Sequence, residues 1–212
     1  APTAYYAVLS KYRYLARRMC WVLAVDSQPA GILVPEGEAE LGDLIAVLEH
    51  LPSPEIVVTG TLGSTAPASA CDGLSVPLVG LTEVAYFTQD MLLEQISRQT
   101  GIDRKVLAAP ADRIWQLTGV WRQPGLDDEQ RAANYIVLRT TSLYELTVSM
   151  AAERVPFWLQ RIASRPAPSE AGRSLVRVDS TFQNVNTQTQ TWRAEVDVTD
   201  LFPFLTKALF QV

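Results

Sequence analysis

Chemical groups that ordinarily perform catalysis are scarce in this chain of 212 residues. The sequence contains one histidine, His50, and two cysteines, Cys20 and Cys71. A Ser–His–Asp triad would have to use this histidine, and no serine lies in the Gly-x-Ser-x-Gly turn of α/β hydrolases. Zinc sites usually draw four ligands from paired clusters of Cys, His or carboxylate residues, which are missing. We therefore expect no catalytic, metal-binding or cofactor-binding residues, and a protein that is not an enzyme.

Long apolar runs and clustered positive charge are missing as well. The longest apolar run, residues 19–25, has seven residues, whereas a transmembrane helix needs about 20. The chain has 18 Lys and Arg against 23 Asp and Glu, a net charge of −5. Nucleic-acid binding depends on clustered cations, and the short basic segment at residues 11–18 is expected to be the exposed side of a helix. We expect a cytoplasmic protein that binds neither membrane nor nucleic acid.

The two cysteines allow two interpretations. Cys20 lies within the apolar run and fits a small, buried hydrophobic residue. Cys71 lies in a turn-like stretch at residues 70–73. A disulfide between them is the alternative, although one bridge in a chain of this length does not indicate a secreted disulfide scaffold. The sequence leaves the pairing open.

The other polar candidates have structural interpretations. His50 ends a predicted helix, where a cation complements the helix dipole; a catalytic role for it is the minor alternative. Asp127 and Asp128 fit the N-terminus of a helix. Asp197 is expected on the solvent-exposed face of a strand, and Asp200 is expected to cap the following turn.

The first part of the chain, about residues 1–86, is predicted to be rich in β-structure. Gly, Pro and Ser residues separate short apolar segments, as in hairpins. Acidic residues precede a periodic apolar segment, which is typical of a helix N-terminus. The predicted elements are strands at 19–26 and 30–34, a helix at 38–50, and strands at 55–62 and 75–79.

The second part, about residues 87–212, is predicted to contain helices followed by a hairpin. Helices are expected at 88–99, at 103–117 as one helix or as two short ones broken at Pro110, and as one long helix near 127–152. Strands are expected at 157–162 and in a C-terminal hairpin whose apolar and polar residues alternate. The long helix has an apolar stripe formed by Ala132, Ile136, Leu143, Leu146 and Met150. The whole chain is predicted to be one α+β domain over residues 1–212, with antiparallel strands and hairpins packed with several helices.

Tryptophan and arginine occur together just before the long helix. Trp115 and Trp121 lie close in sequence to Arg113 and Arg122. Most of the five tryptophans are expected in the core, because aromatic side chains bury a large area. Trp and Arg are also enriched in interface hot spots. These four residues are therefore the candidate binding site, with a role in the core as the alternative.

Several segments together resemble a known family. The most specific are residues 130–135, with the sequence QRAANY, and residues 196–200, with the sequence VDVTD. Residues 19–23 and 29–33 look like the family's early hairpin, and residues 60–62 and 74–79 are similar to its next strands. In this order the segments resemble the C-terminal domain of the cyanobactin maturation proteases of the PatA/PatG type.

The resemblance implies a role without catalytic residues of its own. In these proteases the domain is appended to a subtilisin-like enzyme that cuts or macrocyclises a ribosomally made precursor peptide. The resemblance therefore implies a non-catalytic accessory domain that binds the precursor peptide or maturation enzymes. One alternative is a structural domain without a ligand, including a homodimer. Another is an enzyme that uses His50 or a carboxylate.

Overall fold

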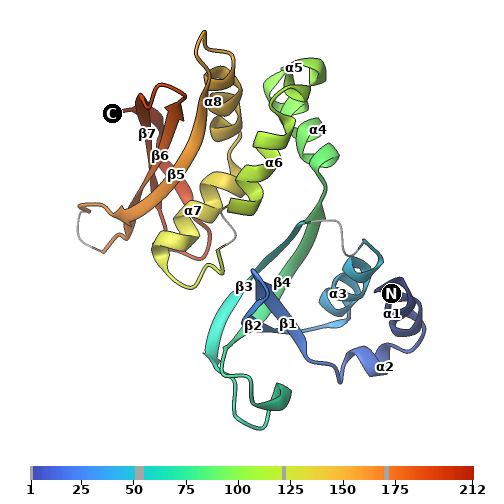
Figure 1. The fold of residues 1–212 in the computed structure, drawn as a ribbon. Coiled ribbons are helices and arrows are strands. Elements are labelled where there is room, and N and C mark those ends of the chain that lie inside the picture. Colours follow the sequence, from blue (N-terminus) through green and yellow to red (C-terminus); the bar gives the residue numbers. More distant parts are fainter. Residues whose placement is uncertain (1, 51–54, 121–122, 170–171) are drawn as a thin grey trace. The chain divides into compact units, whose positions relative to one another are not determined.

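The chain forms two compact units, Ala1–Thr88 and Gln89–Val212, and each contains a four-stranded sheet (Figure 1). A computed structural model describes residues 2–50, 55–120, 123–169 and 172–212, without the side chains of residues 2, 3 and 116–120. The helices and the two sheets confirm the α+β class. A single domain over residues 1–212 stays a prediction.

The first unit has strand order β1-β2-β4-β3. The β1–β2 and β3–β4 pairs are antiparallel, whereas β2 and β4 run parallel. The parallel pair differs from the predicted antiparallel arrangement, because the helix after β2 carries the chain to β3 and the following turn returns β4 beside β2. The elements are α1 (Pro2–Lys11), α2 (Arg13–Ala16), β1 (Trp21–Val25), β2 (Gln28–Pro35), α3 (Glu38–His50), β3 (Glu55–Thr65), the 3-10 turn η1 (Cys71–Gly73) and β4 (Pro77–Phe87).

Helix α3 organises the core of the first unit and has the predicted bounds. Leu41, Leu44 and Ile45 are buried at helical spacing. Leu44 joins a cluster with the sheet, and Leu41 and Ile45 join a second cluster with α1 and α2. The acidic first turn of the helix accepts ion pairs from Arg13 and Arg17 at Glu38. Figure 1 shows α3 next to both α1 and the sheet.

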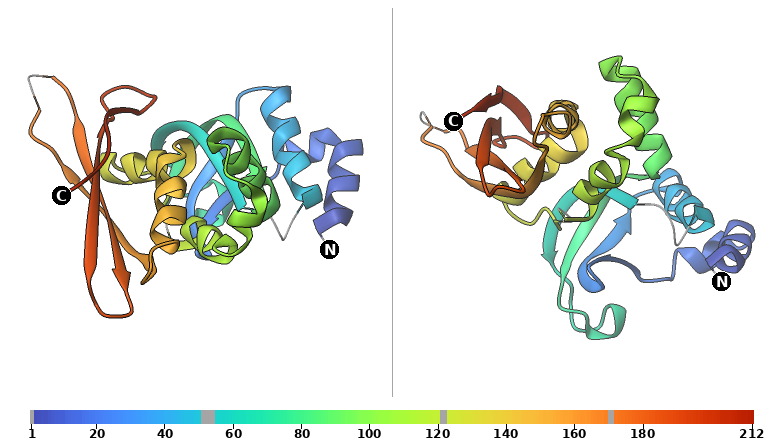
Figure 2. Two further views of the ribbon diagram at one scale, coloured as in Figure 1. Left: turned by 90° about the horizontal axis from the view of Figure 1, so that it is seen from above. Right: turned by 45° about the horizontal axis from the view of Figure 1, so that its top comes forward.

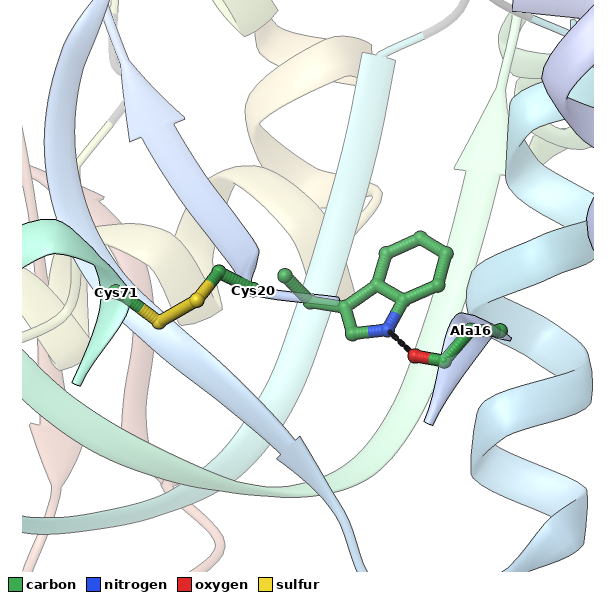
Figure 3. Close-up of a disulfide and its surroundings, with 4 residues drawn as sticks. Ala16, Cys20 and Cys71 are labelled. Carbon is green, nitrogen blue, oxygen red and sulfur yellow. Dashed lines mark hydrogen bonds between the residues drawn. A yellow bond between two sulfur atoms is a disulfide. The ribbon is translucent and has the colours of Figure 1, made fainter. Parts of the chain in front are cut away.

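A disulfide links Cys20 to Cys71, with 5.6 Å between the Cα atoms (Figure 3). It connects the residue before β1 to η1, between β3 and β4. The expectation that Cys20 is buried is wrong, because Cys20 is exposed. Side chains alternate along β1, and Trp21, Leu23 and Val25 take the less exposed positions. The Trp21 indole N–H donates to the Ala16 carbonyl at 2.9 Å.

The second unit has strand order β5-β6-β7-β8, and all of its strand pairs are antiparallel. Helices α7 and α8 cover one face of this sheet (Figure 2). The elements are α4 (Gln89–Thr100), α5 (Arg104–Ala108), α6 (Ala111–Val120), α7 (Asp128–Arg139), α8 (Ser142–Ala151), β5 (Phe157–Pro166), β6 (Leu175–Asn184), β7 (Thr189–Asp197) and β8 (Phe204–Gln211).

The predicted long helix near 127–152 is divided into α7 and α8. Thr140 has extended backbone angles, and its hydroxyl donates to the Ile136 carbonyl at 2.8 Å. The Tyr144 hydroxyl donates to the Val137 carbonyl at 2.7 Å and so satisfies a carbonyl at the end of α7. The predicted N-cap is confirmed, since Asp127 accepts from the Gln130 backbone N–H at 2.8 Å.

One core joins α7 and α8 to the sheet in the second unit. All five residues of the predicted apolar stripe are buried in it. Phe182 on β6 is fully buried between the sheet and the helices. The buried residues are Ala132, Ile136, Val137, Leu143, Leu146, Met150, Phe157, Ile162, Val176, Val178, Phe182, Ala194, Val196 and Val198.

Candidate functional site on the C-terminal sheet

The two faces of the C-terminal sheet differ in chemistry. On β6, Val176, Val178, Ser180 and Phe182 are buried on the core side, and Arg177, Asp179 and Thr181 between them point to the opposite face. This alternation agrees with the prediction. We call the opposite face the outer face; its polar residues on adjacent strands are Arg161, Arg165, Arg177, Asp179, Thr181, Thr191, Arg193, Glu195 and Lys207.

Asp179 is held between two arginines on the outer face. Arg193 on β7 donates to both carboxylate oxygens, at 2.6 and 3.0 Å. Arg165 on β5 donates to the same carboxylate at 3.0 Å. The Arg193 guanidinium is the main cause that lowers the pKa of Asp179, and it outweighs the opposing effect of burial. These ion pairs therefore connect β5, β6 and β7 around one negative charge.

Glu195 is the centre of a second set of ion pairs on the outer face. Lys207 on β8 lies 2.8 Å from its carboxylate, and Arg177 on β6 donates to it at 3.1 Å. Hydrogen bonding from Lys207 is the largest cause that lowers the pKa of Glu195. Glu195 was expected on an exposed face, but it is buried because these two cations cover it. Ion pairs therefore connect all four strands, through Asp179 and Glu195.

Asp197 also differs from its predicted environment. It was expected to face solvent, yet only 1% of it is exposed. Its carboxylate accepts a hydrogen bond from the Thr199 backbone N–H at 2.9 Å and forms an ion pair with Arg173. Hydrogen bonds from Thr199 are the first cause of the lowered pKa of Asp197, followed by Arg173. Asp197 therefore fixes the turn after β7.

The last strand in the sheet order, β8, exposes apolar side chains. Phe204 and Phe210 are 43% and 39% exposed. Phe210 lies opposite Arg193 of the outer face and Phe204 lies opposite the buried Asp197, and Lys207 lies between the two phenylalanines in the strand. Leu201 and Phe202, just before the strand, are also exposed. Exposed backbone and apolar groups on an edge strand favour pairing with another strand.

The sequence did not indicate β8 as a strand. Only Leu205 and Leu209 pack against the core, four residues apart. This spacing is also typical of a helix. It arises because the pairing of β7 with β8 is irregular near Glu195. The alternating pattern that predicts a strand is therefore missing from residues 204–211.

The structure describes two of the four predicted binding residues. Arg113 and Trp115 lie on α6, where Arg113 is exposed and Trp115 is half-buried. The Arg113 guanidinium lies 5.5 Å from the centre of the Trp158 ring on β5. Trp121 and Arg122 lie outside the described residues. A binding site formed by all four residues stays a prediction.

The groups considered for catalysis lie in structural surroundings. His50 stacks on Tyr86 with 3.9 Å between the ring centres. Asp127 caps α7, and Asp128 pairs with Arg131 at 3.1 Å. In the described part of the chain, His, Cys, Asp and Glu residues form no group of three or more able to hold a metal ion. Every helix found in the same residues is too short or too polar to cross a bilayer.

The fold and the outer face define a two-unit α+β protein with a charged β-sheet surface. Comparison with protein families matches the PatG C-terminal family over residues 99–211. This match spans more than half of the chain, and the chain belongs to the PatG C-terminal family.

A solved structure named "PatG Domain of Unknown Function" has a similar fold. The TM-score is 0.66 at 14% sequence identity, and the alignment covers 98% of this chain and 86% of that one. At this identity the likeness concerns the fold. A search of curated proteins finds no match.

Proposed function

We propose that this chain is a non-catalytic accessory domain of a subtilisin-like maturation protease in cyanobactin-like ribosomal peptide biosynthesis. In this proposal it acts in the cytoplasm and binds the precursor peptide or a maturation enzyme. Membership of the PatG C-terminal family supports the link to such a protease. The surroundings of His50 and of the capping carboxylates support a role other than catalysis.

The observation that carries the proposal is the edge position of β8. An edge strand offers backbone N–H and C=O groups to an extended peptide, which adds to the sheet as a further strand. Phe204 and Phe210 offer apolar contacts beside this edge. A peptide strand that pairs with β8 would cover both side chains, and their burial would add to the binding energy.

Binding of the labelled precursor peptide and of the partner protease tests the proposal. The double variant Phe204→Ala/Phe210→Ala should weaken binding about tenfold, since it removes two aromatic anchors. Leu138→Ala is the matched control, because Leu138 is an exposed apolar residue on α7 in the same unit. If neither ligand binds at about 100 µM, a weak affinity even for a transient complex, the proposal fails.

The same edge also favours a second candidate function, dimerisation. A second copy could pair its own β8 with this strand, and exposed Leu201 and Phe202 would enlarge the apolar contact. Sedimentation over a wide concentration range distinguishes the two functions. A monomer at all concentrations excludes dimerisation, whereas a dimer lost in the Phe204→Ala/Phe210→Ala variant supports it.

Two features determine how the binding assay is done. Disulfides are rare in reducing compartments, so binding is compared with the Cys20–Cys71 bond intact and reduced.

The predicted site at Trp115, Trp121, Arg113 and Arg122 is tested with Trp115→Ala and Trp121→Ala. If these variants weaken binding and the β8 variant does not, the peptide site lies at the tryptophans.

A further inference from the structure

The outer face carries more positive than negative charge. Asp179 is shared by Arg165 and Arg193, and Glu195 is shared by Arg177 and Lys207. Each carboxylate therefore leaves one surplus positive charge. Arg161 is exposed, and the described residues include no carboxylate that pairs with it. These seven side chains together have a net charge of +3.

This surplus is local. The residues of the first unit include nine acidic and four basic side chains, a net charge of −5, and those of the second unit include fourteen of each sign. A net charge of +3 on one sheet face therefore differs in sign from the chain as a whole.

The charged groups are spaced at regular intervals. Arg177, Asp179 and Thr181 follow one another at every second residue of β6, and each faces a partner on β7. Every second residue of a strand is separated by roughly 7 Å. Arg161 and Arg165 on β5 lie opposite Thr181 and Arg177, so these two cations are four residues, or roughly 14 Å, apart. An extended peptide with carboxylates on one face has side chains four residues apart at the same distance.

Four of the five cations, all except Arg161, are also held by ion pairs before any ligand binds. Arg193 and Arg177 are 20% and 32% exposed and are hydrogen-bonded to carboxylates on neighbouring strands. Binding to such groups loses less conformational entropy than binding to freely rotating side chains. Arg165 and Lys207 are 56% and 60% exposed, so they remain accessible to a ligand.

We propose that the outer face binds an acidic segment of a protein or peptide in extended conformation, with its carboxylates on one face. Arg161 and Arg165, four residues apart on β5, receive these carboxylates, and Lys207 on β8 adds positive charge to the same face. Nucleic acid fits the face less well, because its affinity depends on neutralising many successive phosphates, which takes a larger cluster of cations than a face with a net charge of +3. The surface is distinct from the backbone edge of β8, and acidic binding here does not require a strand to pair with β8.

Fluorescence anisotropy with short labelled peptides tests this inference. One peptide alternates Glu and Thr, a second has the same composition with all Glu residues together, and a third replaces Glu with Gln. The alternating peptide should bind tightest, and its affinity should fall as salt is raised from about 0.05 to about 0.5 M. Equal binding of the Gln peptide would overturn the inference, as would tighter binding of single-stranded DNA. Equal binding of the clustered peptide would show that the carboxylates need not lie on one face of the peptide, and it would overturn that part of the inference.

Charge variants then locate the binding surface. Arg161→Gln/Arg165→Gln should weaken binding of the alternating peptide about three- to tenfold. Arg139→Gln/Arg154→Gln is the matched control, since it removes the same charge from exposed residues of the same unit. A loss of equal size in the control would contradict the inference. The acidic peptides are not the precursor, so the two kinds of binding can fail separately. Acidic-peptide binding can be absent while the precursor still binds at β8, and precursor binding can be absent while the acidic peptides still bind.

Discussion

The two sheets of this chain have the same number of strands but are held together by different means. The sheet of the first unit is joined to α1, α2 and α3 by small apolar clusters, and the Cys20–Cys71 disulfide links the residue before β1 to η1. The sheet of the second unit packs one continuous core against α7 and α8, and ion pairs cross its outer face. The comparison suggests that a covalent link compensates for a small core, because small cores supply little stability.

The largest effect is expected in the core of the second unit. Phe182→Ala should lower the free energy of unfolding by about 3–5 kcal/mol, because it leaves a cavity at a fully buried site. Urea denaturation measures the change. Phe210→Ala, at an exposed site, is the control and should cost well under half as much. Similar losses for the two variants would contradict the assignment of the core.

A somewhat smaller effect is expected from opening the disulfide. Cys20→Ser/Cys71→Ser should cost about 2–4 kcal/mol, because the bond closes a loop with a sequence separation of 51 residues. Hydrogen exchange should quicken in β1, β3 and β4 and stay unchanged in β5–β8. Faster exchange in both units would show that the disulfide stabilises more than its own sheet.

The ion pairs of the outer face should contribute less. Asp179→Asn should cost about 1–3 kcal/mol, because Arg165 and Arg193 lose a charged hydrogen-bond acceptor. Thermal unfolding at neutral pH measures the loss. Glu153→Gln, at an exposed residue in the loop after α8, is the control and should be nearly neutral. If Asp179→Asn changed the stability as little as the control does, the ion pairs of Asp179 would add no stability.

The same carboxylates should make the second unit sensitive to acid. The pKa values of Asp179 and Glu195 are lowered from ordinary values of 3.8 and 4.5. Their stabilising effect is therefore complete above these ordinary values and is lost as the pH falls through the lowered values of the folded state. Denaturation curves between neutral pH and about pH 2 should show this loss. Asp179→Asn should reduce the slope of the free energy of unfolding against pH. An unchanged slope would contradict the lowered pKa of Asp179.

The smallest effect is expected at the break between α7 and α8. Tyr144→Phe should cost about 1 kcal/mol, because the Val137 carbonyl loses its hydrogen bond from the Tyr144 hydroxyl. Burial also raises the pKa of Tyr144, so this tyrosine should resist ionisation in alkaline solution. Tyr135→Phe serves as the control, since Tyr135 is only partly buried. A titration of Tyr144 at the ordinary pKa would contradict its burial.

The sequence predicted those parts of the fold where local pattern and tertiary environment agree. Helix α3 has the predicted bounds, because acidic residues mark its start and apolar spacing marks its length. Strand β6 likewise follows simple alternation. The break at Thr140 was not predicted, since the apolar stripe continues across it from Ile136 to Leu143.

The candidate site was harder to predict than the fold. The burial of Glu195 and Asp197 depends on cations from other strands and loops, among them Lys207 and Arg173. Local alternation gives the face of a side chain but not what covers it. A signal was nevertheless present, because the strands of the second unit carry four arginines, Arg161, Arg165, Arg177 and Arg193. The pairing of Cys20 with Cys71 is likewise a property of the folded chain.

Amide hydrogen exchange with and without the precursor peptide tests the central claim most directly, because it compares the edge strands of the two units in one experiment. The account predicts that the peptide slows exchange in β8 and leaves β1 and β3 unchanged, since a strand added to β8 protects its free N–H groups. Binding of the peptide without slower exchange in β8, or with protection only in the first unit, would contradict the account.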